Sequence, residues 1–350
     1  MATAHLTIDL DALGRNWQAL DRLSGPDTRT AATVKADGYG LGAARVAQAL
    51  WQAGARHFFV AVAEEAVAVR AALGPEAWIG VFSGHMAGDA GLIRDRRLVP
   101  MLNSAPQVQR HLTLLPDHPF GLQLDSGMNR LGLEPGDWAL LRDQVLPKGP
   151  ALIMSHLACA DEPGHAMNAR QLRAFREMTG GLGVPCSLAA TGGVLLGAEY
   201  HFQMVRPGIG LYGCRPFEGA EPVVRLSLPV IQVREVEAGE PVGYSCTWTA
   251  PRRSRIATLA AGYADGLLRS LSGKAMLWQG PVPCPLVGRV SMDLLTVDVT
   301  DLPEDPETLD LVNAHHGMDE LADLAGTIGY ELLTSLGPRY ARDYAPIRAS

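Results

Sequence analysis

Short apolar runs alternate with amphipathic stretches, and the texture of the chain changes near residue 220. These two observations predict an α/β protein, with an N-terminal (β/α)8 barrel of the TIM type over residues 1–220 and a C-terminal mainly β domain over residues 221–350. Alternation of strands and helices favours a parallel sheet, and eight such units in about 180 residues favour closure into a barrel. A doubly wound sheet is the alternative, because strand count alone separates these folds poorly.

The predicted barrel strands are the apolar runs that precede residue 220. In order they are AATVK (31–35), HFFVAV (57–62), WIGVFS (78–83), LVPML (98–102), FGLQLD (120–125), ALIMSH (151–156), CSLAA (186–190) and GIGLYG (208–213). The stretches between them repeat apolar residues at helical spacing. Clear examples are ARVAQALWQAG (44–54), EEAVAVRAAL (64–73), SAPQVQRHLTLL (104–115) and MNARQLRAFREMT (167–179).

Beyond residue 220 the pattern is that of a β domain. Short β-like runs are joined by Gly/Pro turns, as in VVRLSLPVIQVREVEAG (223–239), RIATLAAG (255–262), KAMLWQG (274–280), CPLVGRV (284–290) and LLTVDVT (294–300). Helical spacing returns only in MDELADLAG (318–326). Residues 221–350 are therefore expected to form a separate domain.

Composition excludes several classes of protein. A hydrophobic content of 47% with 19% charged residues is typical of a globular core, and a net charge of −7 argues against binding nucleic acid. The longest uncharged run, residues 178–198, holds six glycines and a proline, so no membrane span is expected. The N-terminus has no signal-peptide pattern, and the five cysteines form no C-x-x-C motif. These features favour a cytoplasmic protein.

Lys35 is the most informative single residue. The chain has 30 basic residues but only three lysines, and of these Lys148 and Lys274 lie in turn-like segments. Lys35 alone follows an apolar run. A buried lysine is unfavourable unless it is paired or used chemically, because burial opposes its charge.

The segment around Lys35 has two interpretations. Gly38, Gly40 and Ala43 fit the G-x-G-x-x-G/A pattern of a dinucleotide-binding turn, with Glu64 and Glu65 at the required distance. That interpretation predicts a nicotinamide dehydrogenase. The other makes Lys35 a reactive amine at the end of the first strand.

Other chemistry-bearing residues follow the predicted strands at their carboxyl ends, where barrel enzymes place their sites. They are Lys35, Asp125, Arg130, His156, the turn ATGG (190–193) and the turn VRPGIG (205–210). An amine, arginines and glycine-rich turns that can bind phosphate are what a pyridoxal phosphate site needs.

Eight motifs in order resemble those of the alanine racemases. They are VKADGYGLGA, LDSGMNRLG, MSHLACADE, VRPGIGLYG, VGYSCTW, GYADGLLRSLS, GRVSMD and GTIGYE. The resemblance implies a pyridoxal 5'-phosphate-dependent homodimer that interconverts L- and D-alanine, a small-molecule amino-acid substrate. It also implies a role in D-alanine biosynthesis, although the sequence leaves a catabolic role open.

The resemblance also implies residue roles. Lys35 would form the aldimine with the cofactor and act as one acid/base group, and Tyr244 from the other subunit would act as the second. Two groups on opposite faces of a planar carbanion suffice for racemisation. The implied cofactor-binding residues are Lys35, Tyr39, His156, Arg206, Gly208, Ile209 and Tyr330. The implied substrate-binding residues are Arg130, Met292 and Tyr263.

Within this scheme Arg206 would face the pyridine nitrogen. Since an arginine does not give up its proton, the ring would stay unprotonated there and side reactions would be restrained. His156 would link Arg206 to Tyr244, so that a cation favours the phenolate.

The sequence departs from the family pattern at two places. Gln123 stands where the family usually has a lysine that orients the arginine, and a neutral amide is expected to accept from Arg130 instead. Thr191-Gly192 stands where the family usually offers Asn-Ser to the phosphate. The expected substitutes are the Thr191 hydroxyl, backbone N–H groups or water.

Several alternatives stay open at this point. The substrate range includes serine or a broader set of amino acids, and a lyase or decarboxylase of the same architecture would use another group opposite Lys35. A pyridoxal phosphate carrier would need no second domain. His156, Cys159, Asp161 and His165 match no standard metal spacing, so no metal is expected.

Overall fold

A computed structural model describes residues 4–347 of the chain. The described residues form two compact units. The barrel unit consists of residues 13–211 and 216–220, and the β unit consists of the segments up to Ala12, from Tyr212 to Arg215 and from Glu221 onward. Each unit has its own core and is described separately below.

The barrel unit is built from parallel strands in sequential order. Its strands are β2 (Arg29–Thr30), β3 (Ala32–Thr33), β4 (His57–Val60), β5 (Trp78–Val81), β6 (Val99–Leu102), β7 (Gly121–Gln123), β8 (Ile153–Met154), β9 (Cys186–Ser187) and β10 (Met204–Val205). β3 to β9 form one sheet, and β10 pairs in parallel with β2, which with β3 makes a single strand interrupted at Ala31. The predicted run of parallel strands is thus confirmed.

Hydrogen bonds between β9 and β10 close the barrel. Gln203 N donates to Cys186 O at 3.1 Å, and Arg206 N donates to Ala189 O at 2.8 Å. With the β10–β2 pair this gives eight strands in a ring. The predicted (β/α)8 barrel is therefore confirmed.

Apolar side chains fill the barrel, which is the usual reason such a sheet closes. One buried cluster takes Phe59 from β4, Met101 from β6, Met154 from β8 and Met204 from β10, together with Ala31. These are alternate strands of the ring, as layered barrel packing requires.

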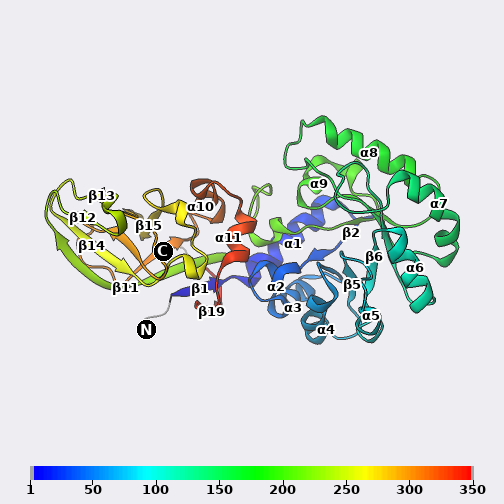
Figure 1. The fold of residues 1–350 in the computed structure, drawn as a ribbon, viewed down its shortest axis with the longest axis horizontal. Helices are drawn as coiled ribbons and strands as arrows, with labels where there is room; N and C mark the ends of the chain where they lie inside the picture. The colour runs from blue at the N-terminus through cyan, green and yellow to red at the C-terminus, as the bar shows by residue number, and fades with distance from the viewer. Residues whose placement is uncertain (1–3, 348–350) are drawn as a thin grey trace. The chain divides into compact units, whose positions relative to one another are not determined.

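Helices connect the barrel strands and lie outside them (Figure 1). They are α1 (Leu10–Ser24), α2 (Lys35–Tyr39), α3 (Ala43–Ala53), α4 (Ala66–Leu73), α5 (Ala90–Asp95), α6 (Ala105–Leu114), α7 (Pro135–Val145), α8 (Ala166–Thr179) and α9 (Thr191–Leu196). Their buried residues recur at helical spacing, as in α3, where Ala43, Val46, Ala47 and Leu50 are buried. No helix of the described chain is long and apolar enough to cross a membrane.

Two features of the barrel region differ from the prediction. The eighth strand is β10, whereas residues 209–212, expected to be that strand, form the 3-10 helix η4 (Ile209–Tyr212). Pro207 has no N–H to offer a strand neighbour, and Leu211 N bonds back to Gly208 O. The first strand, β1 (His5–Ile8), pairs with strands of the β unit rather than with a barrel strand.

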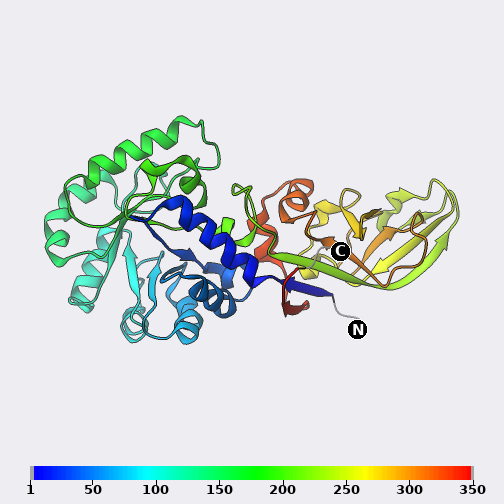
Figure 2. The ribbon, with the colours of Figure 1, turned by 180° about the vertical axis from the view of Figure 1, so that it is seen from behind.

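The β unit is mainly a mixed sheet of eight strands. Its strands are β1, β11 (Val224–Val236), β14 (Ser254–Leu259), β15 (Met276–Gln279), β16 (Val282–Pro285), β17 (Leu295–Asp298), β18 (Thr308–Val312) and β19 (Ala341–Tyr344). All pairs are antiparallel except β1–β19. β11 pairs with β1, β14 and β18, and Figure 2 shows it as the long strand of this unit. Alternating burial along β1 and β17 is typical of a sheet with one buried face.

Smaller elements complete the β unit. A separate pair, β12 (Pro241–Val242) and β13 (Trp248–Thr249), flanks the 3-10 turn η5 (Tyr244–Cys246). The 3-10 turns η6 (Tyr263–Asp265) and η7 (Arg269–Leu271) follow β14, and helices α10 (Met318–Ala325) and α11 (Gly329–Ser335) precede β19.

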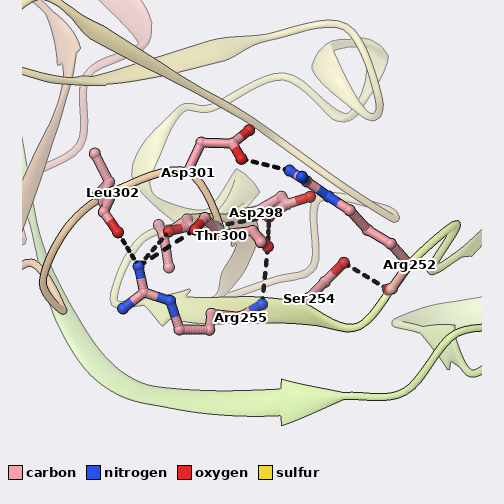
Figure 3. A network of polar contacts seen from close by, with 8 residues as sticks. Arg252, Ser254, Arg255, Asp298, Thr300, Asp301 and Leu302 are labelled. Atoms are coloured by element: carbon pink, nitrogen blue, oxygen red, sulfur yellow. Dashed lines mark hydrogen bonds and ion pairs between the residues drawn. The ribbon is translucent and has the colours of Figure 1, made fainter.

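A polar network joins the start of β14 to the loop after β17 (Figure 3). Arg255 N donates to Thr300 Oγ1 at 2.9 Å, and the Arg255 guanidinium donates to the carbonyls of Val299 and Leu302. Arg252 forms an ion pair with Asp301 at 2.6 Å, and both of these side chains are more than half exposed. The loop is therefore held mainly through Arg255.

Candidate active site

Lys35 lies two residues beyond the end of the first barrel strand, at its carboxyl end, and its side chain is half-buried. The residues that follow it leave the strand in an unusual way. Ala36, Asp37 and Tyr39 have positive φ angles of 52°, 54° and 54°. Non-glycine residues in this region store strain, which is typical of functional sites. Gly38, with φ 64°, fits the same left-handed turn without that strain.

The carboxylate of Glu65 holds this turn in place. Its Oε1 accepts from Ala36 N and its Oε2 accepts from Ala61 N, both at 2.8 Å. Glu65 thus ties the turn after the first strand to the end of β4. Glu65, one of the two carboxylates that matched the dinucleotide pattern, therefore has a structural role, and this weakens the nicotinamide interpretation.

Burial lowers the pKa of the Lys35 amine, the nearby charge of Arg130 lowers it further, and Glu65 partly opposes both effects. An amine with a lowered pKa is more often neutral, and a neutral amine is the form that attacks a carbonyl or accepts a proton. The environment of Lys35 therefore favours chemical use of this side chain.

Arg206 follows β10 directly and is 3% exposed. Its guanidinium donates to Ser155 O at 2.6 Å and to the hydroxyl of Ser187. Burial lowers its pKa to about 9, so the side chain stays charged at neutral pH. The barrel holds a cation here without a carboxylate partner among the described residues.

His156 lies after β8, near enough to three cationic side chains for their charges to lower its pKa. Burial lowers its pKa to about 3, and Arg206, Arg130 and Lys35 add to the effect. The ring is therefore neutral at neutral pH. In the described structure the Arg206 guanidinium bonds to Ser187 and to backbone carbonyls rather than to His156. The expected link from Arg206 through His156 stays a prediction.

A buried network that sequence reasoning missed fixes the backbone around His156. Gln171 of α8, which is fully buried, donates to His156 O at 2.9 Å and to Ser126 Oγ at 3.2 Å, and accepts from Ala158 N at 2.8 Å. Ser126 Oγ lies 2.7 Å from Ser155 Oγ, and Ser155 O accepts from Arg206. The available signal was the position of Gln171 on the buried face of α8, beside Leu172 and Phe175.

A second group of atoms forms a cup after β9 and β10. The hydroxyl oxygen of Thr191 accepts from Gly208 N at 3.1 Å and from Gly210 N at 3.3 Å. The Tyr39 hydroxyl lies over Gly208, because a Cβ at residue 208 would be 2.3 Å from it. These backbone N–H groups, the hydroxyl and the phenol lie together, and they could bind a phosphate if the N–H groups exchanged the Thr191 oxygen for a phosphate oxygen. Of the Thr191-Gly192 pair, Thr191 therefore supplies the side chain at this cup.

The loop after β7 carries Arg130. The Asp125 carboxylate accepts from Gly127 N and Met128 N at 2.8 and 2.9 Å, which fixes the turn, and Arg130 is exposed. Gln123 is buried and its amide donates to Leu131 O at 3.1 Å. The described structure has no hydrogen bond from Arg130 to Gln123, so Gln123 acts on this loop through the backbone.

The remaining predicted site residues lie in the β unit. Tyr244, Tyr263 and Met292 are exposed, at 71%, 45% and 53%, and Tyr330 of α11 is half-buried. Tyr244 lines a groove of about 970 Å³ together with Ile231, Pro241, Arg289 and Leu294. Large exposed apolar and aromatic side chains along one groove are typical of an interaction surface.

No group of three or more His, Cys, Asp or Glu side chains suited to a metal is found between residues 4 and 347. The barrel, the lysine with its lowered pKa, the buried arginine and the phosphate cup define a barrel-type enzyme with a lysine-centred pyridoxal phosphate site.

Comparison with known proteins identifies the family. The family model for "Alanine racemase, N-terminal domain" matches residues 8–216, and the model for "Alanine racemase, C-terminal domain" matches residues 223–344. The chain therefore belongs to the alanine racemase family, which are amino-acid racemases, and the resemblance seen in the sequence is confirmed.

Individual relatives agree over the full length. An alanine racemase of Cereibacter sphaeroides is 67% identical over 349 residues, covering 100% of both chains, and one of Rhizobium meliloti is 46% identical over 98% and 97%. Among solved structures, alanine racemase from Bartonella henselae with covalently bound pyridoxal phosphate has a TM-score of 0.94 and 37% identity, covering 99% of this chain and 100% of that one. The biosynthetic alanine racemase of Pseudomonas aeruginosa has a TM-score of 0.90 and 38% identity over the same shares.

Proposed function

We propose that the protein interconverts L- and D-alanine with pyridoxal 5'-phosphate, using Lys35 and the partner subunit's Tyr244 as the two acid/base groups. The observation that carries the proposal is the half-buried Lys35, whose pKa is lowered by burial and by Arg130, at the carboxyl end of a barrel strand. The alternative substrates are serine or a broader set of small amino acids.

The residues of the barrel unit fit the cofactor. The Gly208 and Gly210 N–H groups, the Thr191 hydroxyl and the Tyr39 phenol would hold the phosphate, together with Ile209 N and Tyr330. Gly208 has no room for a Cβ because the Tyr39 phenol oxygen occupies that position, so the glycine lets this phenol approach the backbone of the cup. When bound, pyridoxal phosphate supplies a carbonyl for Lys35 and a conjugated ring that delocalises the charge left by a departing proton.

Lys35 serves on one face of the substrate α-carbon. Its amine takes up the α-proton in one direction and returns a proton in the other. Arg206 would face the ring nitrogen of the bound cofactor and would keep its own proton, since the guanidinium remains charged at neutral pH. His156 would lie between Arg206 and Tyr244, and because its ring is neutral, Arg206 would supply the positive charge on this side of the site.

Tyr244 serves on the opposite face and is supplied by the second subunit of a homodimer. Two features support this: Tyr244 is 71% exposed, and it lies on a large groove with exposed apolar neighbours such as Ile231. A second copy of the chain, with its barrel unit against this groove, would cover these side chains. A monomer that retains full activity would contradict the assignment.

Substrate recognition is assigned to Arg130, Met292 and Tyr263, and a second tyrosine, Tyr330, is assigned to the cofactor. Arg130 is an exposed arginine on a fixed turn, suited to a carboxylate. The tyrosines narrow the site for a small side chain. The protein is assigned to the cytoplasm and to D-alanine biosynthesis.

The test measures racemisation in both directions over a panel of L- and D-amino acids, with purified protein and added pyridoxal phosphate. Lys35→Ala is expected to lose both activity and the cofactor absorbance, and Lys148→Ala, at an exposed lysine of the same unit, is the matched control. Racemase activity of Lys35→Ala in the absence of added amine would contradict the proposal. If activity on serine exceeds activity on alanine, serine would replace alanine as the proposed substrate.

A further inference from the structure

Two adjoining loops of the β unit carry Tyr263 and Met292. Their backbones are joined directly, since Tyr263 N donates to Ser291 O and Ala264 N donates to Met292 O, both at 3.0 Å. Both side chains are about half exposed. The positions of the two side chains are therefore coupled through the loop backbones.

Close packing makes this contact specific. A Cβ at Gly262 would lie 2.3 Å from Ser291 O and 2.4 Å from Met292 O, so only glycine lets the loops meet in this way. Asp265 ends the first loop, and its carboxylate accepts from Gly262 N at 2.9 Å.

Arg339 clamps both loops from a third segment of the unit. Its Nε and Nη2 donate to the two oxygens of Asp265 at 2.5 and 2.7 Å, and its Nη1 donates to Asp293 Oδ1 at 2.7 Å. Asp265 is 4% exposed and belongs to the turn of Tyr263, whereas Asp293 directly follows Met292. A planar guanidinium donates two parallel hydrogen bonds to one carboxylate and a third to another, and the single nitrogen of an ammonium does not reproduce this fork.

A cavity lies beside the contacts of Arg339 with Asp265 and Asp293, and it leaves space into which the two loops could shift. It has a volume of about 370 Å³ and is lined by Asp265, Asp293, Leu294, Arg339 and Tyr340, among others. The Tyr340 hydroxyl is buried and has no hydrogen-bond partner among the described residues. Without the arginine, the loop of Asp293 would keep its backbone bonds to Tyr263 N and Ala264 N but would lose the ion pair that holds its carboxylate at the edge of this cavity.

We propose that Arg339 is a positioning residue that fixes the spacing of Tyr263 and Met292 and so restricts the enzyme to substrates with small side chains. This inference rests on the proposed function, in which these two residues face the substrate. Arg339 itself touches no reacting atom. Its loss therefore acts on substrate fit rather than on proton transfer.

The test compares racemisation of alanine and of 2-aminobutyrate, which is larger by one methylene, in Arg339→Met and Arg339→Lys. We expect kcat for alanine to stay close to that of the parent and KM to rise. A methylene is discriminated by about 10- to 200-fold in a shaped pocket, and we expect the preference for alanine to fall by about tenfold in both variants. Arg339→Lys keeps the positive charge but loses the two parallel hydrogen bonds to Asp265.

Two further variants separate positioning from general destabilisation. Arg252→Met removes the ion pair with Asp301 in the same unit and should leave the preference unchanged. Asp293→Asn weakens only the exposed arm of the clamp and should give a smaller loss in the same direction. Tm and cofactor absorbance check that each variant is folded and loaded.

The outcomes are distinguishable. If the parent protein racemises alanine and Arg339→Met keeps the parent's KM and preference, or changes them no more than Arg252→Met does, the inference is wrong while the proposed function stands. If the parent racemises no amino acid, both are wrong.

Discussion

The hydroxyl of Tyr39 lies over Gly208, so close that a Cβ at residue 208 would be 2.3 Å from the phenol oxygen. Tyr39 ends the left-handed turn that begins after Lys35, and Gly208 follows the last barrel strand. The first and eighth strands therefore meet at this pair, on the face that carries the lysine.

Replacing Gly208 by alanine should destabilise the barrel unit, because the new methyl overlaps the phenol oxygen. We expect a loss of about 1–3 kcal/mol in the free energy of unfolding, as for other overpacked sites. In Gly208→Ala, the further change Tyr39→Phe removes the overlapping oxygen and leaves the ring carbon at 3.2 Å. Urea unfolding of both single variants and the double variant should show favourable coupling. Additive losses would contradict the contact.

Thr191→Val should weaken cofactor binding, because the methyl group cannot accept from Gly208 N and Gly210 N or donate to a phosphate. Loss of such a partner costs about 1–3 kcal/mol, or roughly 5- to 150-fold in Kd. Titration with pyridoxal phosphate, followed by absorbance, measures the effect. Thr191→Ser keeps the hydroxyl and should bind like the parent, so equal weakening in both variants would rule out a role for the oxygen.

Gln171→Leu should destabilise the barrel unit although leucine has a similar size. The change leaves Ala158 N, His156 O and Ser126 with fewer partners in a buried place, and each such loss costs about 1–3 kcal/mol. Gln109→Leu is the matched control: its amide bonds to Thr113 on an exposed helix face, where a change within about 0.5 kcal/mol is expected. Equal urea midpoints for the two variants would argue against the network.

Arg130→Gln should raise the pKa of Lys35, because the arginine charge lowers it. A higher pKa means that the neutral amine appears only at higher pH. The rate at which cofactor-free protein captures pyridoxal phosphate should therefore begin to rise at higher pH than in the parent. Arg142→Gln, at an exposed arginine of α7 that pairs with Asp143, should leave the pH profile unchanged. A shift towards lower pH would contradict the assigned electrostatics.

His111 should make the cofactor-free protein sensitive to acid. Burial lowers its pKa to about 4, partly opposed by the bond to His118 O. Between the ordinary value near 6.5 and about 4 the unfolded chain binds a proton that the folded chain does not, so stability falls as the pH falls through this window. His111→Gln removes the group that takes up this proton. The slope of the free energy of unfolding against pH should therefore decrease by up to about 1.4 kcal/mol per pH unit. Urea unfolding between pH 4 and 7 measures the slope; an unchanged slope would contradict the prediction.

Much of the fold was predictable because barrel strands are short, local and apolar. Seven of the eight predicted runs contain a parallel strand of the ring, and Lys35 stood out by its place after the first of them. The eighth strand was predicted at residues 208–213 but forms at Met204–Val205, because its position depends on a distant pairing partner and not on its own residues. Met204 and Val205 pair with Arg29 and Thr30, far away in the chain.

The sequence by itself determined the order of seven barrel strands and the position of the lysine, which depend on local patterns, and the family, which depends on eight short motifs along the chain. Only the tertiary structure decided that Glu65 holds the lysine turn, that Gln171 supports the backbone of His156, and that Arg339 joins the loops of Tyr263 and Met292. These contacts join residues on different elements. Local periodicity does not encode which polar side chain satisfies a distant buried group, because that depends on how the elements pack.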